Sequence, residues 1–288
     1  MTEDEWATIR TPDQLPDSFF QAASARKLRL FMVACCRRLW PHLLPAMRAV
    51  VEVAERYADG AASDDEARVA SLAVFPEDYG PPKADIWQPG TWPQYDPRLV
   101  ELISERARPS AMLLEITTQR KIDYPNVPIE QIVPHAVLIY ENLNEVLACM
   151  PSASDPLRAD ELWELALCIT QDTAVAAAAS IDTTGSGPEA CDSYEARVDT
   201  ELAAQVPLLR DLFGRPGDLI SFDRDWLTSV VLGLARGIYD DRAFDRLPIL
   251  ADALQDAGCM DERVLTHCHG PGPHTRGCWA LDLILGLG

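Results

Sequence analysis

Hydrophobic residues recur at helical spacing wherever a period can be read along this chain of 288 residues. In the segment 24–40, SARKLRLFMVACCRRLW, a step of 100° per residue groups one apolar stripe, formed by Leu28, Phe31, Met32, Cys35 and Leu39. Three arginines of the segment fall on the opposite side, with a lysine and a fourth arginine flanking them. The pattern predicts an amphipathic helix with a basic back.

The same spacing predicts further helices along the rest of the chain. Their ranges are 46–60, 63–75, 96–107, 109–121, 131–150, 161–181, 194–214, 223–241, 246–258 and 260–268. Gly60 stands where a left-handed residue commonly ends a helix, and Pro207 indicates a kink or a break. The segment 183–193, TTGSGPEACDS, has the composition of a loop. Alternating runs are scarce, so the prediction is an all-α fold, an irregular multi-helix bundle that ends in a helix-loop-helix.

The segment 76–97 differs in composition from the helices around it. It is rich in proline and also carries Trp87, Trp92 and Tyr95. A disordered linker rarely holds so many aromatic residues, so we expect an irregular strap packed over the helices. The chain is interpreted as a single domain, 1–288, whose possible subdomains are 1–75 and 98–288, joined by this strap.

Charge and composition limit the classes of partner. The formal net charge is -20, from 45 acidic and 25 basic residues, which makes general attraction to nucleic acid or an anionic membrane unfavourable. No apolar run approaches the roughly 20 residues of a membrane span, and the acidic start of the chain does not resemble an export signal. The eight cysteines of such a chain fit reduced thiols. We therefore expect a cytoplasmic protein whose partner is another protein; the oligomeric state is left open.

The basic back of the segment 24–40 offers two interpretations. Its arginines can bind an external anion, or they can pair with the acidic helices of the same chain. The number of acidic residues favours pairing within the chain.

Two separated blocks resemble a bacterial family of uncharacterised proteins, numerous in planctomycete-type genomes. The first block joins RKLRLFMVACCRRLW to VEVAERYADG, and the second runs from WLTSVVLGLARGIYDDRAFDRLPILADALQDAGC through GPGPHTRGCWALDLILG. The resemblance covers the N-terminal quarter and the last third of the chain. It implies a shared fold and supplies no activity.

Histidine and cysteine gather near the end of the chain. The stretch HCHGPGPHTRGCW, residues 267–279, lies between two predicted helices. Thiolates and imidazoles are the ligands that zinc prefers, and the candidate ligands are Cys259, His267, His274 and Cys278. Their intervals do not form the two tight pairs of a zinc finger. The alternative is a structural corner, in which buried cysteines pack as small apolar residues and the histidines end a helix. The sequence favours this corner over zinc, because Cys278 shares a helical face with two leucines.

Catalysis at the same stretch is the weakest interpretation. It would use Cys278, His274 and Arg276 as a hydrolase or a transferase. The chain contains no phosphate-binding glycine loop, dinucleotide fingerprint, HExxH pair or GxSxG elbow. We therefore expect a protein-interaction or regulatory module, with a zinc site as an additional possibility and an enzyme as the alternative.

Overall fold

Over the residues that it describes, the computed structural model contains helices joined by turns and loops and no β-strand, which confirms the predicted all-α fold class. The described residues are 2–74, 96–104, 188–215, 217 and 222–287, with positions 114, 116–118, 121–122, 128–130, 132, 166, 170 and 174. The proline-rich strap predicted at 76–97 falls almost wholly outside them. Among the described helices, none is both long enough and apolar enough to cross a membrane.

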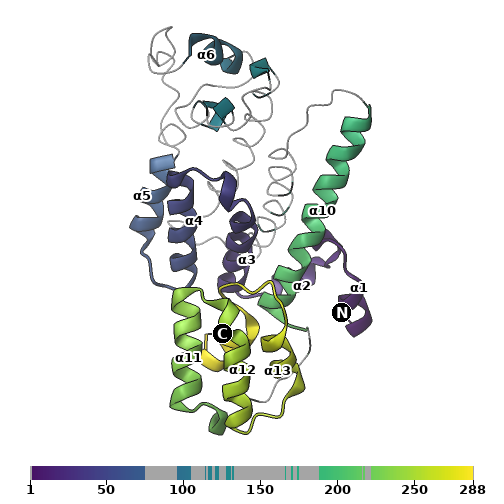
Figure 1. Cartoon of the computed structure of the whole chain (residues 1–288), viewed down its shortest axis with the longest axis vertical. Helices are drawn as coiled ribbons and strands as arrows, with labels where there is room; N and C mark the ends of the chain where they lie inside the picture. The colour runs from purple at the N-terminus through teal and green to yellow at the C-terminus, as the bar shows by residue number, and fades with distance from the viewer. Residues whose placement is uncertain are drawn as a thin grey trace.

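The N-terminal helices and one long later helix form the first part of the fold (Figure 1). The helices are α1 (Glu3–Thr8), α2 (Asp17–Gln21), α3 (Ala25–Arg38), α4 (Pro45–Ala58), α5 (Asp64–Val74) and α10 (Pro188–Phe213), with short 3-10 turns at Pro12–Gln14 and Trp40–His42. A further helix, α6, spans Pro97–Ser104. Helix α3 packs against both α4 and α10, so it lies at the centre of this part.

The last 60 or so described residues form a second group of helices. They are α11 (Ser229–Asp241), α12 (Leu247–Asp256), α13 (Glu262–His269) and α14 (Trp279–Leu285), with 3-10 turns at Arg224–Trp226 and Phe244–Arg246. Thr228 and Asp261 cap α11 and α13, because the side chain of each accepts a backbone N–H of the first turn. Helix α11 packs against α12 and α14, and α12 packs against α13.

Helix α3 is buried on more sides than its apolar stripe predicted. The stripe residues are buried, and so are four neighbours outside it, Leu30, Val33, Ala34 and Cys36. The arginines leave the helix at its edges and pair with acids of other elements, Arg26 with Asp59 and Arg38 with Glu201. Pairing within the chain, rather than an external anion, is the role that these contacts support.

Helix α10 begins earlier than the sequence suggested. Residues 188–193 were predicted as part of a loop, and this prediction is wrong because α10 starts at Pro188. Proline is well suited to a first helical turn, where its missing N–H has no partner to lose. Pro207 lies inside the helix without ending it, and the helix stops before Gly214, whose φ is +63°.

The buried apolar side chains separate into two clusters. The first joins helices α1 to α4 with the end of α10, from Val206 to Leu212. The second contains only residues from Val231 to Ile284. Over the described residues, the apolar core therefore divides between α10 and α11, whereas the sequence placed its candidate boundary at the strap.

Buried charges join the two clusters. Asp282 of α14 is 5% exposed and accepts two hydrogen bonds from the Arg26 guanidinium, at 2.6 and 3.1 Å. Lys27 Nζ lies 2.6 Å from the same carboxylate and donates to the carbonyl oxygens of Leu212 and Gly277. Lys27 of α3 is thus hydrogen-bonded both to α10 and to the loop before α14.

A second carboxylate, Glu55 of α4, reinforces this junction. It is 4% exposed and bonds Arg37 of α3, at 2.8 Å, and Arg242, which follows α11. Asp59, one helical turn later, accepts from Arg26 and from the Tyr239 hydroxyl, the latter at 2.8 Å. Since removal of one partner from a buried ion pair leaves an uncompensated charge, these contacts fix how α11 and α14 sit on α3 and α4.

Gly277 offers a direct test of the junction. Its φ is +87°, and a Cβ there would lie 2.6 Å from Leu30 Cδ1 and 2.9 Å from Leu212 Cδ2. We expect Gly277→Ala to lower the free energy of unfolding by about 2–4 kcal/mol, from backbone strain plus overpacking, measured by urea denaturation.

Gly258 is the matched control for this substitution. Its φ is +90°, but a Cβ there would meet no atom within 4 Å. Gly258→Ala therefore carries the backbone strain without the clash and should cost only about 1 kcal/mol. Equal losses in the two variants would show that the contact of Gly277 with α3 and α10 does not limit stability.

Candidate metal centre

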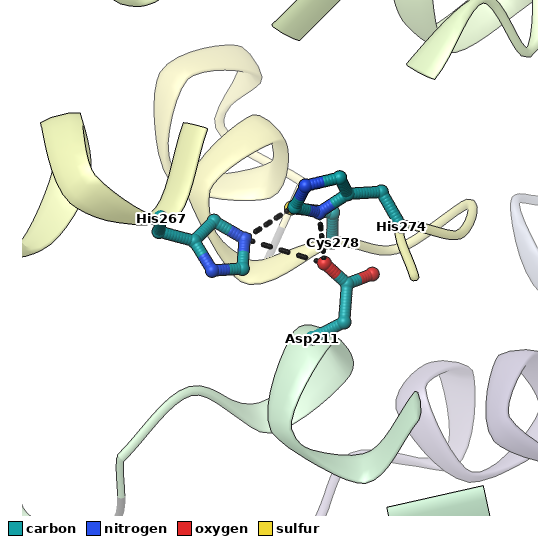
Figure 2. A group of neighbouring side chains, drawn as sticks. All are labelled: Asp211, His267, His274 and Cys278. Carbon is teal, nitrogen blue, oxygen red and sulfur yellow. Dashed lines mark hydrogen bonds and ion pairs between the residues drawn. The ribbon is translucent and has the colours of Figure 1, made fainter. Parts of the chain in front are cut away.

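Four side chains that can hold a metal ion converge where the two clusters meet. They are Asp211, His267, His274 and Cys278, and one ligand atom from each lies within 4.8 Å of the others. Asp211 comes from the last turn of α10, His267 from α13, and the other two from the loop that leads to α14. Figure 2 shows these side chains pointing toward one another from three segments of the chain.

Local structure explains how the loop brings its two residues to the site. Helix α13 ends at His269, and Gly272, whose φ is +80°, then allows the chain to turn. The Cys278 N–H donates to the Thr275 carbonyl at 3.0 Å, which closes the turn before α14. The close approach of Gly277 to α3 and α10 holds the next residue, Cys278, with its ligand atom within 4.8 Å of that of Asp211.

Asp211 is the centre of the hydrogen-bond network. Its Oδ1 lies 2.7 Å from His274 Nδ1 and 3.2 Å from His267 Nε2, while its Oδ2 accepts the Thr275 N–H at 2.8 Å. The carboxylate is 2% exposed. Burial disfavours its charge, but the bonds with the two histidines outweigh burial and hold the pKa of Asp211 below its ordinary value. Asp211 is therefore an ionised carboxylate inside the protein.

His274 has a fixed orientation. Its Nε2 lies 3.3 Å from the Gly270 carbonyl oxygen, which can only accept a hydrogen bond, and its Nδ1 faces Asp211. Burial opposes its charge, yet the hydrogen bond with Asp211 raises the pKa of His274 above its ordinary value. A histidine whose outer nitrogen donates to a backbone carbonyl is also the usual arrangement of a metal ligand.

His267 bridges the remaining members. Its Nε2 lies 3.1 Å from Cys278 Sγ, and its ring meets the His274 ring nearly edge to face, with centroids 4.9 Å apart. The Trp279 indole N–H donates to His267 Nδ1 at 3.2 Å. This bond places the proton of a neutral His267 on Nε2. A metal bound at Nε2 would require that proton to move to Nδ1, and the hydrogen bond from the indole to Nδ1 would then break.

The separations of the ligand atoms lie on either side of those that a small tetrahedral ion requires. Zinc bonds of about 2.0–2.1 Å to nitrogen or oxygen and about 2.3 Å to sulfur separate neighbouring ligand atoms by roughly 3.3–3.6 Å. The three nearest separations in the group are 2.7, 3.1 and 3.2 Å. These three pairs would have to separate slightly, and any pair as far apart as 4.8 Å would have to approach, for the four atoms to surround such an ion.

Three of the four predicted ligands belong to this group. Cys259 does not: it is buried in the second cluster, and Asp211 takes the fourth position. No motif around Asp211 distinguishes it from the other acids of α10, and 55 residues separate it from His267 in the sequence. Only the packing of α10 against the loop reveals it.

Cys278, the thiol suggested for catalysis, lies 3.1 Å from His267 Nε2 but is not accessible from the surface. Cys278 is 0% exposed, and burial, the first cause, together with the charge of Asp211 raises its thiol pKa well above the ordinary value. Cys36, the other thiol beside an arginine, is also buried, with a pKa raised to about 12. The Arg276 guanidinium lies over the Tyr239 ring and near Asp59, on the junction of the two clusters.

Comparisons with protein-family models, curated proteins and solved structures give no match for this chain. The resemblance of its two blocks to a bacterial family therefore stays a prediction.

The burial of Cys278 predicts slow alkylation. With the native protein at pH 8, iodoacetamide should modify Cys278 at least 100-fold more slowly than in guanidinium chloride, because only the exposed thiolate reacts. Peptide mass spectrometry at timed intervals measures both rates. Rapid labelling of Cys278 in the folded protein would contradict this and favour a reactive thiol.

Proposed function

We propose that this chain is a helical protein-interaction module in which a structural zinc ion holds the C-terminal unit, helices α11 to α14, in place. The observation that carries the metal part is the convergence of Asp211, His267, His274 and Cys278 within 4.8 Å of one another. Nitrogen and sulfur ligands favour zinc over magnesium or calcium, which prefer oxygen. The ligands come from α10 and from the C-terminal unit, so the ion would connect the two clusters.

The character of the ligands supports a structural role for the metal. Four protein ligands complete a tetrahedral site, whereas catalytic zinc keeps one position for water or substrate. Asp211 and Cys278 are almost completely buried, at 2% and 0% exposed. A zinc ion held there would supply bonds that stabilise the fold. The Thr275 N–H and the Gly270 carbonyl orient the carboxylate and His274 for that role.

The interaction role rests on the helical fold and on the burial of the described free cysteines, none of which is accessible to a substrate. The described free cysteines, Cys35, Cys36, Cys259, Cys268 and Cys278, are all buried and reduced. Such thiols fit the reducing cytoplasm, which is the compartment we propose.

Metal analysis of single variants tests the zinc centre. Protein purified without chelator should contain one zinc ion per chain, measured by inductively coupled plasma mass spectrometry. The variants Cys278→Ser and Asp211→Asn should each retain less than a tenth of that zinc. Chelation of the wild-type protein should also lower its thermal midpoint, because the metal binds the folded state only.

Cys259→Ser is the matched control for these variants. Cys259 is as buried as Cys278 and lies in the same cluster, but it is outside the ligand group. It should therefore lose stability without losing zinc. A metal-free wild-type protein that cannot be loaded with zinc would overturn the metal part, and the four side chains would then form a hydrogen-bonded network centred on Asp211.

Trp279 should report metal binding. Because its indole N–H donates to His267 Nδ1, a metal at Nε2 displaces that hydrogen bond. We expect zinc added to chelated protein to change tryptophan emission, by about 10% or more, and to change it far less in Trp279→Phe. An identical response in both proteins would show that the metal does not bind through His267.

A further inference from the structure

A pocket of 510 Å³ lies between α12 and α13, on the opposite side of α13 from the metal ligand His267. Six residues line it, Gln255, Glu262, Leu265, Thr266, His269 and Gly270. Glu262, Thr266 and His269 are spaced four and three residues apart, so they share one face of α13. Leu265 is 8% exposed and supplies an apolar contact within the pocket.

Helix α12 extends this surface beyond the pocket. Ile249, Asp252 and Asp256 are exposed and are spaced three and four residues apart, on the side of α12 opposite its buried Leu250 and Leu254. His269 Nε2 lies 3.8 Å from Asp252 Oδ1, which connects the exposed face of α12 to the wall of the pocket. The two helices therefore form one continuous surface, which we call the α12–α13 groove.

Apart from His269, which is charged only when protonated, the charged side chains that line the groove are acidic. Glu262 lines the pocket, Asp252 is 72% exposed beside it, and neither lysine nor arginine is among the lining residues. Arg263 is the neighbouring cation, and its guanidinium bonds Asp261 at 2.6 and 3.1 Å. A positively charged ligand is thus favoured electrostatically at this surface.

Exposed apolar side chains accompany these acids. Met260, in the turn between α12 and α13, is 83% exposed, and Ile249, near the start of α12, is 54% exposed. Methionine is flexible and adapts to differently shaped apolar partners, which makes it frequent at binding surfaces. A surface that combines acidic and apolar side chains is complementary to a partner segment that combines basic and apolar side chains.

We propose that the α12–α13 groove binds a basic peptide segment of a partner protein, in which lysine or arginine side chains flank apolar ones. The basic groups pair with Glu262 and Asp252, and the apolar side chains cover Met260 and Leu265. This inference rests on the interaction role proposed above, and it does not require the metal. Helix α13 supports both sites, because His267 faces the ligand group while Glu262, Thr266 and His269 face the groove.

A synthetic probe tests the groove without knowledge of the natural partner. We would use a fluorescein-labelled 14-residue peptide of leucine and lysine, with the leucines at helical spacing, and follow its fluorescence anisotropy with the full chain at about 0.15 M salt. Micromolar binding is expected, with at least 10-fold weakening in the double variant Glu262→Lys/Asp252→Lys. Met260→Ser should weaken binding about 3-fold, since only its apolar contact is removed.

The matched control separates the groove from the general acidity of the chain. Glu195 and Asp199 are exposed acids of α10, and Glu195→Lys/Asp199→Lys makes the same change in net charge. This control should weaken binding less than 2-fold. Equal losses in the two double variants, or no binding by the wild-type protein below about 100 µM, would overturn the inference.

The metal content of the same samples keeps the two proposals apart. A wild-type protein that binds the peptide at the groove but cannot be loaded with zinc would refute only the structural metal. Zinc bound as expected, with no loss of peptide affinity in the groove variant, would refute only the docking surface. Circular dichroism of each variant confirms that the helices remain folded, which the exposure of the substituted side chains favours.

Discussion

The ion pairs of Asp282 with Arg26 and Lys27 hold together the two halves of the described fold, the N-terminal helices with α10 and the helices α11 to α14. Each half has its own apolar cluster, so burial of hydrophobic side chains within the halves does not by itself fix their relative position. A carboxylate that is 5% exposed needs its cationic partners, because an unpaired charge in this environment is strongly destabilising. The orientation of α14 on α3 follows from that requirement.

Lys27 extends this constraint to the candidate metal centre. Its ammonium group donates to the carbonyls of Leu212 and Gly277, the residues that directly follow Asp211 and directly precede Cys278. One side chain of α3 therefore sets the distance between two of the four proposed ligands. The polar group around Asp211 depends on the same junction as the salt bridges, and a change that separates the halves would separate the ligands as well.

The sequence predicted the helices well where apolar spacing was regular. The expected range 46–60 includes all of α4 (Pro45–Ala58) except its first residue. Gly60 adopts the left-handed conformation, with φ of +69°. The start of α10 was missed because glycine, serine and proline before residue 188 resemble a loop, although proline is also a favoured first residue of a helix. Composition alone does not separate these two roles.

His267, His274 and Cys278 were recognisable from the sequence because zinc ligands of the right types occur within one short stretch. Cys259 seemed equivalent by that criterion, yet the fourth member of the group is Asp211, an ordinary acid of a distant helix. The sequence by itself thus determined the helical fold, the paired charges of α3 and three of the candidate ligands, since these depend on residue type and local spacing. Only the tertiary structure decided which acid completes the group, because that choice depends on the packing of α10 against a loop more than 50 residues away.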